Sequence, residues 1–164
     1  RWSRGCGCTQ DSEWKNYLRE FVEAVAKIVD EAFEEFISNF KVDKWQFRNN
    51  YIDVILGRVS ETDFIRKYID LNEDLKLEKI ISNLLQSQYE RQRMFTSCGW
   101  FFEDFDRIEP HNIIAYASQS LNLVSELNGI DYFETVKPKL EKIVSTKTGI
   151  TGVDVFNKFY IRPI

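Results

Sequence analysis

At 164 residues the chain has the length of about one domain, and 43% apolar with 29% charged residues is the composition of a globular protein rather than a disordered one. The net charge of −4 and the absence of a Lys/Arg stripe argue against non-specific binding to nucleic acid. No apolar run reaches the roughly 18–20 residues that a membrane span requires, so neither nucleic acid nor membrane is an expected partner.

The N-terminal sequence and the cysteines indicate the kind of protein that contains this chain and the compartment in which it folds. It opens "RWSRGCGC", with no initiating Met and no signal-peptide pattern, and we interpret residues 1–164 as a single domain from a longer protein. Three cysteines make an odd count, which favours free thiols in a reducing cytoplasm.

The first part of the chain predicts a short irregular arm followed by a long helix. Residues 1–11 contain two glycines and no apolar period. Asp11 or Ser12 can cap a helix over 13–40, in which apolar residues recur at steps of three and four over about seven turns.

Capping residues predict the next three helices. Asp43 can begin a helix that runs to Leu56 and stops at Gly57. Ser60 and Asp63 stand three residues apart ahead of another apolar period. A fourth helix is expected over about 75–95.

The C-terminal third predicts further helices and no convincing strand. Pro110 suits the first turn of a helix that ends at Asn128-Gly129. Asp131 opens a shorter helix interrupted by Pro138. In the tail over 149–164, "VDVFNKFYI" suits a last helical turn or an extended segment, and we favour the helix. The fold class is therefore all-α, a bundle of five to seven helices with an irregular N-terminal arm.

The stretch "RQRMFTSCGWFFEDFDRIEP", residues 91–110, is unusually aromatic for a connection between helices. Aromatic residues make up 15% of the chain, which fits either a Phe-rich core or a surface that stacks on sugars or bases. Trp100, Phe101 and Phe102 are consecutive, so they cannot all point into one core. At least one is expected to face outward, where exposed aromatics mark an interface or a ligand groove.

The cysteines and the single histidine suggest two kinds of chemistry that the spacing does not favour. Cys6, Cys8, Cys98 and His111 form a permissible zinc set, but one tight pair and two scattered residues are not the usual spacing of such sites. Cys98 and His111 are also a conceivable nucleophile pair, without an evident third group to orient the histidine. We predict no metal and no cofactor. A Cys-dependent or zinc-containing enzyme is the least favoured interpretation of the chain.

Acidic residues crowd the end of the aromatic stretch at Glu103, Asp104, Asp106 and Glu109. Paired carboxylates beside aromatics are typical of glycosidases, but acids ahead of a helix also complement its dipole, and we favour the second interpretation. Binding of sugar hydroxyls by Glu103 or Asp104 stays open. Arg93 can stabilise a helix C-terminus, pair with a carboxylate or bind sugar hydroxyls.

These motifs resemble a known family. "ERQRMFTSCGWFFEDFDRIEPHNIIAYASQSLNL", residues 90–123, resembles the C-terminal helical domain, of unknown function, of glycoside hydrolase family 57-like proteins related to α-amylase or α-mannosidase. The opening "RWSRGCGC" with Trp14 and a long helix resembles the entry to that domain, where an Arg-Trp pair precedes Cys-Gly-Cys. The resemblance covers about 1–35 and 84–127.

The resemblance implies an activity that this chain does not itself carry. Such proteins act on α-glucans or related glycosides by a retaining mechanism without a cofactor, and their nucleophile Glu and acid/base Asp belong to an N-terminal barrel expected upstream of Arg1. No residue here matches those motifs, so none is predicted to be catalytic. The implied partners are that barrel and a carbohydrate substrate.

The domain packs on the barrel in that family and walls its cleft, so the resemblance implies which residues form the wall. The positions that match are Trp2, Arg4, Cys6, Cys8, Arg93, Thr96, Ser97, Cys98, Gly99, Trp100, Phe101, Phe102, Glu103 and Asp104. We expect the arm and the turn to meet, with Cys6 or Cys8 near Cys98. The alternative is a stand-alone helical interaction module that docks a partner protein through residues 94–105.

Overall fold

The fold is a helical bundle, as predicted. The structure is a computed structural model and describes residues 12–163. Its elements in chain order are α1 (Glu13–Ile37), α2 (Lys44–Asn50), α3 (Ile52–Ile55), α4 (Glu61–Tyr68), α5 (Leu75–Arg93), the 3-10 turn η1 (Ser97–Trp100), α6 (Ile108–Asn128), α7 (Phe133–Leu140) and α8 (Gly152–Phe156). With α2 and α3 counted as one helix interrupted at Tyr51, these residues hold seven α-helices and no strand, which confirms the all-α prediction.

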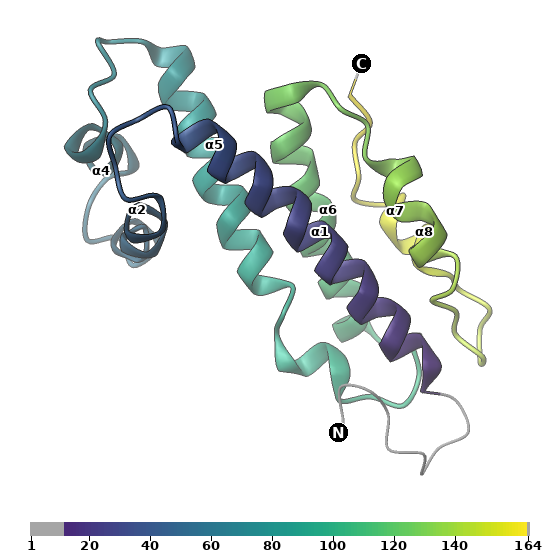
Figure 1. Cartoon of the computed structure of the whole chain (residues 1–164). Helices are drawn as coiled ribbons and strands as arrows, with labels where there is room; N and C mark the ends of the chain where they lie inside the picture. The colour runs from purple at the N-terminus through teal and green to yellow at the C-terminus, as the bar shows by residue number, and fades with distance from the viewer. Residues whose placement is uncertain (1–11, 164) are drawn as a thin grey trace.

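Three long helices form the centre of the bundle (Figure 1). α1 packs against both α5 and α6, and α5 and α6 pack closely on each other. α7 and α8 lie along one side of this trio, against α1 and α6, whereas α2, α3 and α4 lie at the opposite side near the end of α1. The turn between α5 and α6 therefore lies at one end of the bundle, beside the start of α1.

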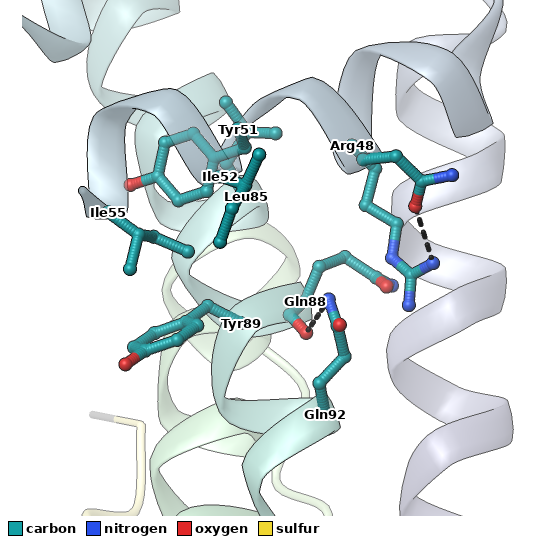
Figure 2. Close-up of a pocket in the computed structure, with 9 residues that line it drawn as sticks. Arg48, Tyr51, Ile52, Ile55, Leu85, Gln88, Tyr89 and Gln92 are labelled. Carbon is teal, nitrogen blue, oxygen red and sulfur yellow. Dashed lines mark hydrogen bonds between the residues drawn. The ribbon is translucent and has the colours of Figure 1, made fainter. Parts of the chain in front are cut away.

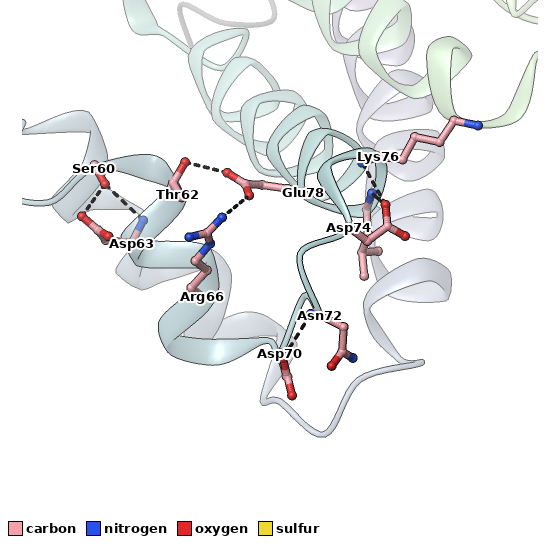
Figure 3. Close-up of polar contacts among 10 residues, drawn as sticks. Ser60, Thr62, Asp63, Arg66, Asp70, Asn72, Asp74, Lys76 and Glu78 are labelled. Carbon is pink, nitrogen blue, oxygen red and sulfur yellow. Dashed lines mark hydrogen bonds and ion pairs between the residues drawn. The ribbon is translucent and has the colours of Figure 1, made fainter.

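Side-chain caps fix where several helices begin. The carboxylate of Asp43 accepts a hydrogen bond from the backbone N–H of Gln46 at 2.8 Å, and the Ser60 hydroxyl accepts one from that of Asp63 at 3.1 Å. Asp74 caps α5 in the same way (Figure 3). Each cap satisfies backbone donors that a helix start leaves unpaired, and the caps expected at Asp43 and Ser60 are confirmed.

The ends of the elements correct the sequence predictions in detail. The first helix ends at Ile37, three residues earlier than expected. Pro138 does not interrupt α7, because it lies in the last turn of the helix, where the chain is about to leave it. In the tail up to residue 163, the short α8 begins at a capping box between Thr151 and Asp154 and is followed by a turn over 157–159 and then by irregular chain.

The short helix α4 is tied to α5 by two carboxylates, Glu61 of α4, which accepts a hydrogen bond from Ser82 at 2.8 Å, and Glu78 of α5 (Figure 3). Glu78 accepts hydrogen bonds from the Thr62 hydroxyl at 2.5 Å and from the Arg66 guanidinium at 3.4 Å. Phe64 and Ile65 of α4 are buried beneath these contacts. Polar contacts at the rim and apolar burial beneath it therefore hold the α2–α4 segment against α5.

The buried side chains fall into two clusters that share α1. One contains the first half of α1 together with α6, α7, α8 and the turn before α6, and the other contains the end of α1 with α2, α4 and α5. Residues of α1 up to Val29 belong to the first cluster, and Phe33 and Ile37 belong to the second. α1 is therefore the element common to both halves of the core.

None of the helices in residues 12–163 combines the length and the apolar character that crossing a membrane requires.

Candidate functional site

The aromatic turn, residues 94–107, joins α5 to α6 and is held tightly against α6. Its 3-10 turn η1 rests on the first turns of α6, where Gly99 is buried. A Cβ atom on Gly99 would lie 2.2 Å from Cδ1 of Ile113 and 3.1 Å from the carbonyl oxygen of Glu109. Glycine is therefore required for this close approach, which positions all the side chains that follow it.

The inner side of the turn is built into the core. Trp100 is only 2% exposed, and the guanidinium of Arg19 lies 4.9 Å from the centre of its ring. The indole N–H of Trp14 donates a hydrogen bond to the carbonyl oxygen of Glu103 at 3.1 Å, and its ring lies 5.8 Å from that of Phe105. The turn is thereby fixed to α1 as well as to α6.

Asp104 fastens the turn to a distant loop. Its carboxylate accepts hydrogen bonds from the backbone N–H of Asp106 at 2.9 Å and from the Thr146 hydroxyl at 3.0 Å, 42 residues along the chain. Burial alone would raise the pKa of Asp104, but hydrogen bonds from Ser145, Asp106 and Thr146, with the nearby Lys147 cation, lower it. This carboxylate therefore stays ionised and serves as a structural tie.

The outer side of the turn exposes aromatic surface. Phe101 is 76% exposed and meets Phe102 edge to face, with the ring centres 5.5 Å apart. The guanidinium of Arg107 lies 4.8 Å from the centre of the Phe102 ring, and that of Arg91 lies 5.3 Å from the Phe95 ring. Phe95 is also exposed, so the outer face presents rings flanked by cations.

The structure divides the predicted wall residues between core and surface. Gly99, Trp100 and Asp104 are buried, so they support the turn from inside and present no side-chain surface to a cleft. Four face solvent, namely Ser97, Cys98, Phe101 and Glu103, and three are half-buried, namely Arg93, Thr96 and Phe102. Trp2, Arg4, Cys6 and Cys8 lie outside the described residues, and so does the expected meeting of arm and turn.

Arg93 is used within the domain. It forms two hydrogen bonds to the Glu90 carboxylate, at 2.8 and 3.0 Å, and its guanidinium lies 4.0 Å from the centre of the Tyr116 ring and 5.4 Å from that of Tyr89. Two of the roles left open for Arg93 are therefore present: it lies in the last turn of α5, and it pairs with a carboxylate.

The histidine beside the turn packs against an aromatic ring, and Nε2 of His111, Oδ1 of Asp106 and Oε2 of Glu109 are buried without a hydrogen bond. The ring of His111 lies 4.9 Å from that of Phe105, and burial and the Lys158 cation lower its pKa, against opposing effects of the Phe105 carbonyl and Asp106. Cys98 is exposed and free. Residues 12–163 contain no group of three or more His, Cys, Asp or Glu side chains placed to hold a metal ion.

A second candidate site lies between α3 and α5, and we call it the α3–α5 groove (Figure 2). A cavity of about 360 Å³ opens between residues 48–55 and 85–92, and a second of about 370 Å³ adjoins it toward α6. Tyr51, Ile55 and Tyr89 line both, so the two cavities are neighbours. Ile52 and Ile55 are exposed at the rim.

Polar side chains at the back of this groove are paired with one another. Arg91 binds both carboxylate oxygens of Asp30, at 3.1 and 2.7 Å, and the Gln88 amide N–H donates to Asp30 at 3.0 Å. Beside them, the Tyr51 hydroxyl donates to Glu61 at 2.5 Å, and burial followed by this carboxylate raises the pKa of Tyr51. Both acids are therefore engaged inside the domain, Asp30 by a cation and Glu61 by neutral donors.

Two polar atoms at the first cavity have no partner. Gln88 is 1% exposed, and its Oε1 is buried without a hydrogen bond, as is Nε of Arg48. Figure 2 shows the Gln88 amide pointing toward the Arg48 guanidinium. Burial and the nearby Arg91 lower the pKa of Arg48, and Asp30 offsets part of that effect. Unpaired buried polar atoms are rare in folded proteins, and each calls for an explanation.

Comparison with known proteins places the chain in a family. The model of a family described as a domain of unknown function, DUF3536, matches residues 11–163. The chain belongs to this family. No curated protein and no solved structure matches it.

Sequence reasoning found one of the two candidate sites of this DUF3536 domain and missed the other. The aromatic turn is conspicuous because Trp, Cys and Gly cluster in one short stretch. The α3–α5 groove is assembled from amides, tyrosines and isoleucines on helices about 40 residues apart, a composition that any amphipathic helix has. It is distinguished by two unpaired residues, Gln88 and Arg48, that line one cavity, and both pairing and cavities are properties of the folded chain.

Proposed function

We propose that this chain is the C-terminal helical domain of a glycoside hydrolase family 57-like protein, which packs on a catalytic barrel and walls its carbohydrate cleft without being catalytic itself. Membership of a family of unknown function is the coarser statement that the comparisons give. The link to glycoside hydrolases rests on the likeness of residues 90–123 to that family.

The observation that carries the proposal is the exposure of Phe101 on a rigid turn. Gly99, Trp100 and Asp104 fix the backbone of the turn from inside, whereas the Phe101 ring is 76% exposed. A large apolar side chain held rigidly in water gains free energy when a barrel surface or a sugar ring covers it, and it loses little conformational entropy in doing so.

The fixed acids support a role in binding rather than catalysis. A glycosidase acid needs a carboxyl with a raised pKa, but the hydrogen bonds to Asp104 lower its pKa. Glu103 is exposed on the same turn and is free to meet sugar hydroxyls or a barrel. The proposal therefore assigns catalytic carboxylates to the barrel and none to this chain.

The test uses the full-length polypeptide that contains this chain. Phe101→Ala should lower kcat/KM on an α-glucan about tenfold, which corresponds to about 1.4 kcal/mol. Phe159→Ala is the matched control, because Phe159 is an exposed phenylalanine, 44% accessible, on the C-terminal tail. The 164-residue chain alone should not hydrolyse the same glucan. Turnover by this chain, or equal activity of the two variants, would contradict the proposal.

The second candidate function is a stand-alone module that docks a partner protein through residues 94–105. The same exposed pair, Phe101 and Phe102, favours it, because edge-to-face rings flanked by Arg107 are also suited to a protein interface. The discriminating observation is the coding sequence upstream of Arg1. An encoded barrel with catalytic carboxylates supports the first function, and a start codon close to Arg1 supports the second.

A further inference from the structure

We infer that the α3–α5 groove binds a saccharide ring through its hydroxyl groups. The described residues that line it lie within 48–55, 85–92 and 119–123, so this site is separate from the aromatic turn.

Two residues that line the first cavity carry complementary polar atoms without partners. Gln88 Oε1 is an acceptor without a donor, and Arg48 Nε is a donor without an acceptor. The other half of the Gln88 amide is fully engaged with Asp30 and the Val29 carbonyl, which fixes Oε1 on the side of Arg48. A hydroxyl is at once donor and acceptor, so one hydroxyl placed between the two atoms satisfies both.

The Arg48 side chain is able to make room for such a hydroxyl. Within the described residues it has no carboxylate at ion-pair distance, and its outer contacts are a hydrogen bond to Asn49 at 3.1 Å and the Trp45 ring at 5.4 Å. A guanidinium held only by neutral groups moves at lower cost than one in an ion pair. The ligand therefore reaches Gln88 by shifting Arg48, which closes over the hydroxyl.

The remaining walls suit the rest of a sugar ring. Tyr51 and Tyr89 present aromatic surface and Ile52 and Ile55 present apolar surface, against which the C–H face of a sugar can pack. Gln92, whose own amide makes only a long hydrogen bond of 3.5 Å to the Gln88 carbonyl, lies at the exposed edge for a neighbouring hydroxyl. The cavity of about 360 Å³ is in the size range of small-molecule sites.

The charges favour a hydroxyl-rich ligand over a simple anion. Asp30 with Arg91 and Glu90 with Arg93 form closed pairs, and Glu61 is held by hydrogen bonds from the neutral donors Tyr51, Ser82 and Gln86. Arg48 lines the first cavity without a carboxylate of the described residues at ion-pair distance, and it leaves room for a sugar that also carries a carboxylate. A free anion would leave Gln88 Oε1 still without a donor, so hydroxyls are the shared requirement.

The test titrates the 164-residue chain, followed by side-chain amide signals in NMR, with maltotriose as the neutral sugar and trigalacturonate as the acidic one. We expect at least one to bind and to shift the amide signals of Gln88 and Gln92. Arg48→Ala and Gln92→Ala should each weaken binding about tenfold. The matched control is Arg58→Ala, which removes an exposed arginine from the end of the same helical segment and should change nothing.

The outcomes separate this inference from the proposed function. Binding of maltotriose identifies a neutral-sugar site, and binding of trigalacturonate alone identifies an acidic-sugar site read by Arg48. The inference is overturned if neither sugar binds, or if Arg48→Ala and Gln92→Ala fold correctly and leave sugar binding unchanged. It is also overturned if a blocked dipeptide amide, tested as a non-sugar ligand, binds and the sugars do not. None of these results depends on hydrolysis, so inactivity of a longer protein would leave the groove untouched.

Discussion

The aromatic turn and the α3–α5 groove lie along the same helix and differ in what makes each a candidate. The turn is distinguished by the kind of residue it contains, and three buried polar atoms without a hydrogen bond, on Asp106, Glu109 and His111, lie where it enters α6. The groove contains ordinary residues, and its two unpaired atoms, on Arg48 and Gln88, belong to residues that line a cavity. An unusual composition therefore marks a segment that needs a special backbone, whereas unpaired atoms beside a cavity mark a place that a ligand can occupy.

The largest expected effect tests the inner side of the turn. Trp100→Ala should lower the free energy of unfolding by about 3–5 kcal/mol, because it removes a fully buried ring and leaves a cavity beneath Arg19. Chemical denaturation monitored by circular dichroism measures the loss. A loss below about 1 kcal/mol would place Trp100 among the surface residues of the turn.

The next effect tests the close approach of η1 to α6. Gly99→Ala should cost about 1–3 kcal/mol, because its Cβ would overlap the Ile113 side chain and press on the Glu109 carbonyl. Gly99→Ala combined with Ile113→Val should recover part of that loss, since the overlapping Cδ1 atom is then absent. Thermal unfolding of the single and double variants gives the comparison, and additive losses would show that Ile113 is not the obstacle.

Asp104 should make the turn sensitive to acid. Its folded-state pKa is lowered, so its contribution to stability is fully present above the unfolded value of about 4 and is lost as the pH falls through the lower folded value. Asp104→Asn should cost about 1–2 kcal/mol at pH 7 and almost nothing below the folded pKa. Urea denaturation of both proteins between pH 7 and about 2 measures this convergence, and a constant difference would argue against an ionised tie.

The smallest effect tests the outer side. Phe101→Ala should change the free energy of unfolding by less than about 0.5 kcal/mol, because the ring is mostly in water. Trp100 and Phe101 are adjacent in the sequence, so the losses of unfolding free energy in Trp100→Ala and Phe101→Ala give the sharpest contrast between the inner and outer sides of the turn. A Phe101→Ala loss comparable to that of Trp100→Ala would mean that the outer side is also part of the core.

The sequence was most informative where local chemistry decides structure. Asp43 and Ser60 predicted helix starts correctly because a cap needs only a side chain and the backbone beside it. It also required one of Trp100, Phe101 and Phe102 to face outward, and Phe101 does. Which of the three would be exposed depends on how η1 sits on α6, and that contact is not local.

The groove was beyond the reach of the sequence for the same reason. Whether Gln88 Oε1 finds a donor depends on where Arg48 arrives from a different helix, 40 residues earlier in the chain. The middle of the chain, 40–80, has the pattern of ordinary amphipathic helix, and nothing in that pattern indicates this meeting. Spacing within a helix carries no information on such a juxtaposition.

The passage of α1 through both clusters has a consequence for how the domain opens. With 25 residues, α1 is about 37 Å long. If α1 frays past its middle, each of the two clusters loses packing contacts that α1 provides. The segment around Val29 to Phe33, where one cluster gives way to the other, is covered from both sides and should retain its amide protons longest in hydrogen exchange. The turn and the groove are therefore two outlying surfaces of a single cooperative unit, and loosening either one would be felt at the other through α1.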